Sequence, residues 1–188
     1  TACWVESGIY GMYFQSTEIR LARFHGDGSY TVLDLLGTDR QELMPSWDFH
    51  ICAAGNIGLS AANATHFPEA CLARPDESGN TYRLQPLTSF GQAVASWSLG
   101  TVEAIHWESK DGTEIEGVLR KPPDFDPHRK YPLVFIVHGG PQDASHTFLL
   151  SGEELRYYPA VQLANQGVLV LKPNYRGSIG RGQAFMEL

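Results

Sequence analysis

The chain has 188 residues, of which 43% are hydrophobic and 19% are charged, a balance typical of globular rather than disordered proteins. Its net charge of −7 and pI near 5.4 argue against a nucleic-acid or anionic-membrane surface. No segment approaches the roughly 18 uninterrupted apolar residues of a membrane span, and the N-terminus lacks the pattern of a signal peptide. We therefore expect neither a nucleic-acid partner nor a membrane partner.

The cysteines and histidines indicate the compartment and exclude a metal centre. Cys3, Cys52 and Cys71 lie far apart, and their odd number is typical of buried thiols in a reducing compartment. We therefore expect a cytoplasmic protein. No pair of histidines has ligand spacing backed by carboxylates or thiols, so we expect no metal and no cofactor.

Residues 1–100 have the pattern of short strands separated by turns, without intervening helices. Glycine-rich connections at 25–28 and 76–80 predict hairpins. This pattern predicts an antiparallel sandwich or a few blades of a β-propeller, and no strict repeat distinguishes the two. The expected strands are 4–14, 18–24, 29–33, 51–60, 70–74 and 82–84.

The pattern changes near residue 100. Segments 102–107 and 114–120 flank Asp111-Gly112, a strong hairpin signal, and a proline-rich loop follows at 121–127. The apolar run 133–137 predicts a strand buried on both faces. A helix from about Pro159 to Gly167 and a second buried strand at 168–171 complete a βαβ unit of a parallel sheet.

The first of these buried strands runs into His138-Gly139-Gly140-Pro141. Glycine permits a sharp bend and leaves backbone N–H groups uncovered. A turn of this kind supplies an oxyanion-hole donor in α/β-hydrolases, although a tight turn without any catalytic role has the same pattern.

No serine of the chain fits the Gly-x-Ser-x-Gly nucleophile elbow. Ser178 comes nearest, but Arg176 stands where the first glycine is required. In this fold the nucleophile, the acid and the base follow the oxyanion loop in that order. We therefore expect all three to lie beyond Leu188, and we expect the chain to be a piece of a longer protein, because it also opens at Thr1 without methionine.

The stretch 174–182, NYRGSIGRG, is glycine-rich and follows a strand. Its glycines at 177, 180 and 182 form neither a dinucleotide-binding fingerprint nor a P-loop. A loop that shapes the rim of an active site is the better interpretation.

Together, "KPPDFDPHRKYPLVFIVHGGPQ" and "VLVLKPNYRGSIGRGQAF" closely resemble the start of the catalytic domain in the prolyl oligopeptidase family of serine peptidases, in its acylaminoacyl-peptidase and dipeptidyl-peptidase branch. The resemblance is strong over 101–188 and weak over 1–100, where Pro68-Glu69-Ala70 departs from the more usual Pro-Glu-Leu. It implies the last blades of a β-propeller at 1–100 and the start of an α/β-hydrolase domain at 101–188, ending before the nucleophile elbow.

The resemblance also implies a mechanism and roles for single residues. The parent, the longer protein that we expect, would hydrolyse short peptides by acyl transfer through a serine, a histidine and an aspartate. Gly140 would carry an oxyanion-hole N–H, Gly139 would allow the bend, and His138 and Pro141 would fix the turn. Arg176 and Gly177 would shape the rim. The chain by itself would be inactive.

Two alternatives stay open from the sequence alone. An esterase or lipase could use the same turn on non-peptide esters, although its hydrolase core would usually begin nearer the start of the chain. A propeller interaction module could carry an inactive hydrolase remnant. A homo-oligomer is likewise neither required nor excluded.

Overall fold

The structure, a computed structural model, describes residues 2–140 and 142–188. The chain divides into two compact units. The first contains residues up to Tyr13 and Ile19–Ala95, and the second contains Phe14–Glu18 and Ser96–Leu188. The tip of one hairpin, Phe14–Glu18, thus belongs with the C-terminal part of the chain.

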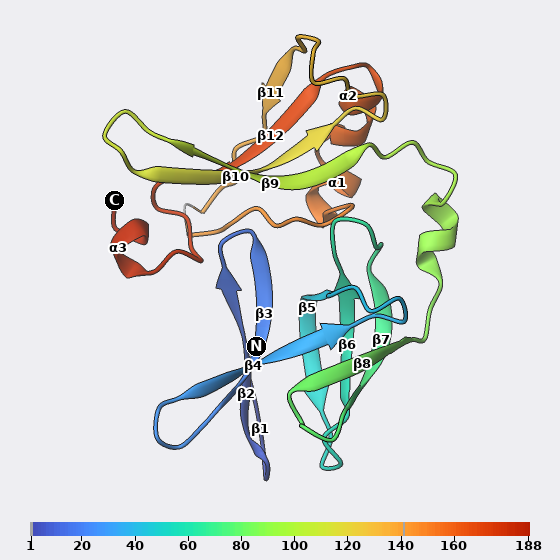
Figure 1. Ribbon diagram of the computed structural model, residues 1–188, viewed down its shortest axis with the longest axis vertical. Helices are drawn as coiled ribbons and strands as arrows, with labels where there is room; N and C mark the ends of the chain where they lie inside the picture. The colour runs from blue at the N-terminus through green and yellow to red at the C-terminus, as the bar shows by residue number, and fades with distance from the viewer. Residues whose placement is uncertain (1, 141) are drawn as a thin grey trace. The chain divides into compact units, whose positions relative to one another are not determined.

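The first unit is built from two groups of four consecutive strands (Figure 1). Neighbouring strands within each group are hydrogen-bonded, and β4 and β8 join the groups through a short parallel pairing. Four-stranded meanders of this kind have the strand number of propeller blades. The strands are β1 (Ala2–Val5), β2 (Gly8–Gln15), β3 (Glu18–Phe24), β4 (Tyr30–Leu36), β5 (Met44–Ile51), β6 (Ile57–Ala62), β7 (Glu69–Pro75) and β8 (Thr81–Pro86). A short 3₁₀ helix, η1 (Phe90–Val94), follows them.

The core of the first unit is apolar. Alternate side chains along the strands face inward, as the period of a half-buried strand requires. Tyr10, Leu21, Leu33, Ile57 and Tyr82 belong to one cluster of buried residues contributed by most of the strands. Both predicted hairpins are confirmed, because β3 pairs antiparallel with β4 and β7 pairs antiparallel with β8.

Two of the predicted strands are each two strands in the structure. The segment 4–14 is interrupted between β1 and β2, and 51–60 is interrupted between β5 and β6. In the second case Gly55 adopts a φ of +79°. There the N–H of Cys52 donates to the Asn56 carbonyl and closes the turn. The turn signal of Asn and Gly was present inside the predicted strand, and most of β5 was missed.

The second unit contains a four-stranded sheet in the order β11-β12-β10-β9 (Figure 1). The hairpin of β9 and β10 is antiparallel, and β11 is parallel to β12, so the predicted βαβ unit is confirmed. The strands are β9 (Thr101–Glu108), β10 (Glu114–Lys121), β11 (Leu133–Phe135) and β12 (Leu169–Asn174), and the helices are α1 (Gly152–Arg156), α2 (Ala160–Asn165) and α3 (Gln183–Met186).

The helix α2 also agrees with the prediction. Pro159 is its N-cap residue, and Gly167, with a φ of +78°, follows its C-terminus. By contrast, α1 was not predicted. Of the helices in the described part of the chain, none is long and apolar enough to cross a membrane.

The prediction that 133–137 is buried on both faces is wrong. Leu133, Phe135 and Val137 are 44%, 57% and 56% exposed, whereas Ile136 is buried and Val134 packs against the small apolar cluster of the sheet. The physical reason is that one face of β11 packs against the apolar cluster, whereas the other face is open in the described chain.

Candidate functional site

The candidate turn lies directly after β11. The N–H of Ile136 still donates to the Leu171 carbonyl, at 2.9 Å, and His138-Gly139-Gly140 follows two residues later. The carboxyl ends of parallel strands lie at one edge of a sheet, where ligands bind in α/β folds. The loop 175–182, which follows β12, is therefore the neighbour of the turn. A backbone hydrogen bond between Ile179 and Asp143 joins the two loops at 3.2 Å.

The two glycines of the turn differ in their backbone. Gly140 has a φ of +125°, and a Cβ at this position would lie 2.8 Å from the Gln142 nitrogen. A Cβ at Gly139 would meet no heavy atom within 4 Å. Glycine is therefore required at Gly140 rather than at Gly139. Both glycines are exposed, and neither N–H donates a hydrogen bond to a residue that the structure describes.

His138 is buried and makes a polar contact with each ring nitrogen. Its Nε2 lies 2.9 Å from Ser178 Oγ, and its Nδ1 lies 3.0 Å from the carbonyl oxygen of Gly139. Tyr175 stacks on the imidazole, with ring centroids 4.6 Å apart. The Tyr175 hydroxyl also donates to the His138 carbonyl, at 2.7 Å.

Ser178 is placed beside a histidine, as a catalytic serine would be, but it is 0% exposed. The other nitrogen of His138 faces a neutral carbonyl instead of the carboxylate that orients the base of a triad. A hydroxyl that no substrate can reach cannot act as a nucleophile. The geometry therefore supports a structural role for Ser178, in line with the missing nucleophile elbow.

Asn174, the last residue of β12, fixes the loop that follows the turn. Its Oδ1 accepts the N–H of Ser145 at 2.7 Å, and its Nδ2 donates to the Ser145 carbonyl at 3.1 Å. Nδ2 also lies 3.4 Å from a carboxylate oxygen of Glu116. All three side chains are buried, so these contacts replace the water that the polar atoms would otherwise bind.

A buried group of charges lies behind the same loop. Glu154 contacts Arg120 at 3.0 Å and Lys172 at 3.5 Å. Burial alone would raise the pKa of Glu154, but the positive charges of Lys172 and Arg120 hold it below its ordinary value. Arg120 also donates to the Leu149 carbonyl, at 2.6 Å, and so ties the network to the loop.

Glu154 has a second role, in the first turn of α1. One of its oxygens accepts the N–H of Ser151 at 2.8 Å, while its own N–H donates to the Ser151 hydroxyl at 3.3 Å. These reciprocal contacts form a capping box, which satisfies backbone donors at the start of the helix.

His146 is not placed as a base. It stacks on Phe14 at 5.0 Å and 9°, and its Nδ1 has no hydrogen-bond partner among the described residues. Burial is the main cause that lowers the pKa of His146 to about 4. The imidazole is therefore neutral near pH 7.

The residues expected at the rim contact other parts of the second unit. Arg176 Nη2 lies 2.5 and 2.6 Å from the two carboxylate oxygens of Asp111, in the turn between β9 and β10. Gly177 has a φ of +92°, and its N–H donates to the Phe185 carbonyl at 3.1 Å. Pro141 lies outside the described residues.

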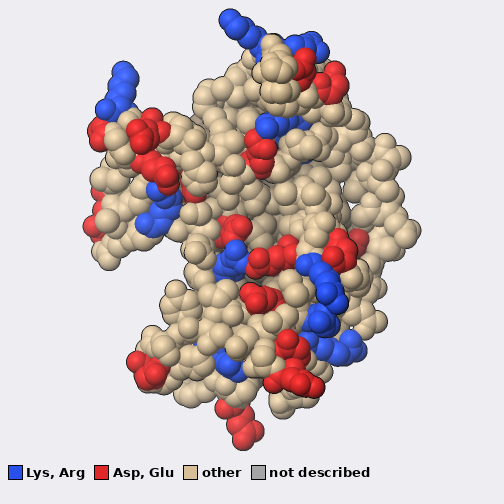
Figure 2. Space-filling model, in the orientation of Figure 1, with Lys and Arg blue, Asp and Glu red and all other residues tan. Residues whose placement is uncertain are grey.

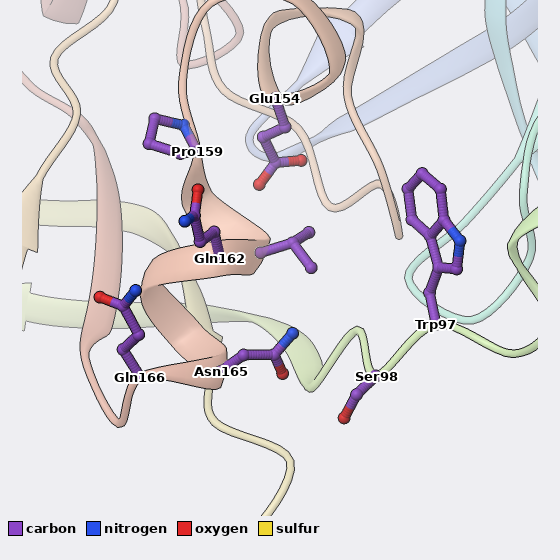
Figure 3. A pocket seen from close by; sticks show the side chains of 8 residues that line it. Trp97, Ser98, Glu154, Pro159, Gln162, Asn165 and Gln166 are labelled. Atoms are coloured by element: carbon purple, nitrogen blue, oxygen red, sulfur yellow. The ribbon is translucent and has the colours of Figure 1, made fainter.

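A hollow of about 620 Å³ lies elsewhere in the second unit, between the segment at Trp97 and the helix α2 (Figure 3). Trp97 lies on one side of it, and Gln162 and Asn165 lie on the other. Glu154 also lines it, although its carboxylate is already paired. The residues lining this hollow include neither the turn nor the 175–182 loop.

On the surface in Figure 2, basic side chains lie among acidic ones.

Sequence reasoning selected the turn but missed the side chains that hold it. The sequence pattern places Asn174, Tyr175 and Ser178 in a glycine-rich loop that shapes the rim of an active site, and it does not identify their contacts with the turn. The available signal was the run of polar residues at the end of a buried strand, where the polar atoms need partners.

Curated relatives share sequence with this chain. It is 34% identical over 115 residues to a probable dipeptidyl-peptidase 5 of Aspergillus niger, covering 61% of the chain and 15% of that protein. It is 31% identical over 114 residues to dipeptidyl-peptidase 5 of Porphyromonas gingivalis, covering 56% of the chain and 16% of that protein. The chain therefore spans about a sixth of the length of these relatives. No family model matches it.

Solved structures share its fold. An acylaminoacyl peptidase of Pyrococcus horikoshii superposes with a TM-score of 0.69 at 20% identity, over 98% of this chain and 26% of that one. Dipeptidyl peptidase 4 of Porphyromonas gingivalis superposes with a TM-score of 0.69 at 18% identity, over 94% of this chain and 24% of that one. These comparisons confirm the resemblance read from the motifs and the predicted fold class, propeller blades followed by the beginning of an α/β-hydrolase.

Proposed function

We propose that the chain belongs to the prolyl oligopeptidase family of serine peptidases and that its parent hydrolyses short peptides by acyl transfer. The relatives are named dipeptidyl-peptidase 5, and these names support substrates of the parent from which dipeptides are released. We assign residues 1–100 to the last propeller blades and 101–188 to the start of the peptidase domain. Three cysteines without a disulfide partner in the described chain support a cytoplasmic location.

The proposed contribution of this chain is one oxyanion donor. When the serine of the parent attacks the peptide carbonyl, negative charge develops on the carbonyl oxygen. The N–H of Gly140 would donate to that oxygen, and a second N–H would come from the residue after the serine. The observation that carries the proposal is an exposed glycine pair at the carboxyl edge of the sheet, whose N–H groups donate to none of the described residues.

The other groups would come from outside this chain. A histidine would take the proton of the serine and return it to the leaving amine, and an aspartate would orient that histidine. None of these roles is assigned to His138 or Ser178, because both side chains are buried and they are hydrogen-bonded to each other. We therefore expect the 188-residue chain to be inactive. Covalent labelling of any of its serines by a fluorophosphonate probe would contradict this.

A matched pair of glycine variants tests the donor. Gly140→Ala keeps the backbone N–H, but a side chain at a φ of +125° and 2.8 Å from the Gln142 nitrogen should force the peptide out of place. In the parent it should therefore lower kcat by about 10²- to 10³-fold, the effect of losing one oxyanion donor. Gly139→Ala is the control, because a Cβ there meets open space. Both variants are assayed on dipeptidyl substrates and on an ester, and folding is checked by thermal unfolding. An unchanged kcat in well-folded Gly140→Ala would show that the donor is assigned wrongly.

A further inference from the structure

We propose that Ser178 and Tyr175 are positioning residues, which hold His138 so that it orients the peptide unit between Gly139 and Gly140. This inference rests on the proposed function, because that peptide unit carries the proposed oxyanion donor. Neither residue contacts the substrate in this proposal. Each acts through His138, to which both are hydrogen-bonded.

The orientation follows from the planarity of the peptide bond. In a trans peptide the carbonyl of one residue and the N–H of the next point in opposite directions. The Gly139 carbonyl is directed at the buried Nδ1 of His138, at 3.0 Å. The N–H of Gly140 is therefore directed away from the imidazole. A rotation of this peptide would turn the donor inward.

The same contact fixes the proton on the imidazole. A carbonyl oxygen can only accept a hydrogen bond, so Nδ1 must be the donor. In the neutral imidazole Nε2 then has a lone pair, and the Ser178 hydroxyl donates to it at 2.9 Å. Ser178 thus selects the tautomer that can hold the Gly139 carbonyl.

Ser178 and Tyr175 are themselves held in place. The N–H of Ser178 donates to the Tyr175 carbonyl at 2.9 Å, which closes a turn, and the Ser178 side chain is fully buried. Tyr175 covers one face of the imidazole and binds the backbone carbonyl of His138. His138 is therefore fixed at its ring and at its backbone by residues four positions or fewer after β12.

A buried hydroxyl could also contribute to stability alone, so the test needs a control variant that loses a comparable buried hydrogen bond. Ser178→Ala and Tyr175→Phe each remove one hydrogen bond to His138. Ser46→Ala removes another buried contact, the 2.7 Å hydrogen bond to Ser60 in the first unit. The readouts in the parent are kcat, KM and the ¹⁵N spectrum of labelled histidines, which reports the tautomer of each imidazole.

We expect Ser178→Ala to lower kcat about 10-fold or more, with KM changed less than about twofold, because misplacement of a catalytic group by about 1 Å can cost 10²-fold. The His138 signal should lose its single Nδ1–H form. Tyr175→Phe should lower kcat less, and Ser46→Ala should leave kcat and the spectrum unchanged.

The outcomes separate this inference from the proposed function. An unchanged kcat in Ser178→Ala, beside a strongly lowered kcat in Gly140→Ala, overturns the positioning role and leaves the donor in place. An unchanged His138 tautomer in Ser178→Ala also overturns it, whatever the activity. An unchanged kcat in Gly140→Ala refutes the donor, and the positioning role falls with it. An equal loss in Ser46→Ala would reveal general destabilisation.

Discussion

The two units of the molecule bury different kinds of side chain. In the described part of the first unit, Ser46 is the one buried residue of the polar and charged types, and the other buried side chains are hydrophobic. The second unit buries Glu116, Arg120, His138, Lys172 and Asn174, with several hydroxyl residues. One apolar cluster of this unit has Ile136, Ala160 and Val170 as its buried members, and other apolar side chains, such as Phe148 and Leu171, are buried beside the polar ones.

This difference shows what each interior does. The apolar core of the first unit holds its strands together mainly by the burial of apolar side chains. In the second unit, Asn174, Arg120 and His138 each bind a backbone carbonyl of the segment 139–149. Polar burial is therefore concentrated where loops without regular structure must be held in one conformation. Those loops are the ones that carry the candidate site.

The largest expected effect comes from breaking the buried charge network. Glu154→Ala would leave Arg120 and Lys172 buried without their carboxylate, and we expect a loss of about 3–5 kcal/mol of stability. Urea unfolding measures it, and the loss should fall on the second unit. The control is Glu114→Ala, which removes exposed contacts to Arg181 and should cost less than about 1 kcal/mol. Equal losses in the two variants would contradict the role of burial.

The corresponding test in the first unit creates a cavity in its apolar core. Ile57 is 0% exposed and belongs to the main apolar cluster, so Ile57→Ala should cost about 2–5 kcal/mol. Ile9, at 43% exposure on β2, is the matched control and should cost far less when changed to alanine. Since no catalytic side chain depends on this core, kcat of the folded parent should not change. A lowered kcat would show that the two interiors are not separable in function.

Sequence patterns predicted the parts of the fold that local chemistry determines. Period-two apolar residues and glycine turns located most strands, and Pro159 and Gly167 bounded α2. The short helix α1 was missed, although Ser151 and Glu154 have capping-box spacing, because five residues are too few for an apolar period. The exposure of Phe135 was also missed, since an apolar run does not reveal which face of a strand is covered.

The candidate site was predictable only as far as its backbone. His138, Gly139 and Gly140 form a local motif, and local motifs can be read from consecutive residues. The partners of His138 are 37 and 40 positions away in the chain. Their hydrogen bonds exist only because β11 and β12 are adjacent and parallel, and no single-sequence pattern specifies which loop atoms then meet.

The smallest expected effect is a pH dependence confined to the second unit. The folded pKa of His146, about 4, lies below the ordinary value of 6.5, chiefly because the imidazole is buried. Asp143 and a hydrogen bond with the Thr17 backbone oppose the lowering of this pKa, and Lys172 and His138 contribute to it. The unfolded chain therefore binds a proton at a higher pH than the folded chain does.

Stability from this group is complete above pH 6.5 and falls as the pH decreases toward 4, by at most about 3 kcal/mol. Urea unfolding of the second unit at several pH values measures the slope. The interval from about 6.5 to 4.5 is the informative one, because carboxylates with ordinary pKa values begin to protonate below it. His146→Phe keeps a ring on Phe14 and removes the proton, so it should flatten the slope in that interval. If the variant kept the full slope, the pH dependence would arise from another group and the neutral, stacked imidazole would not be its cause.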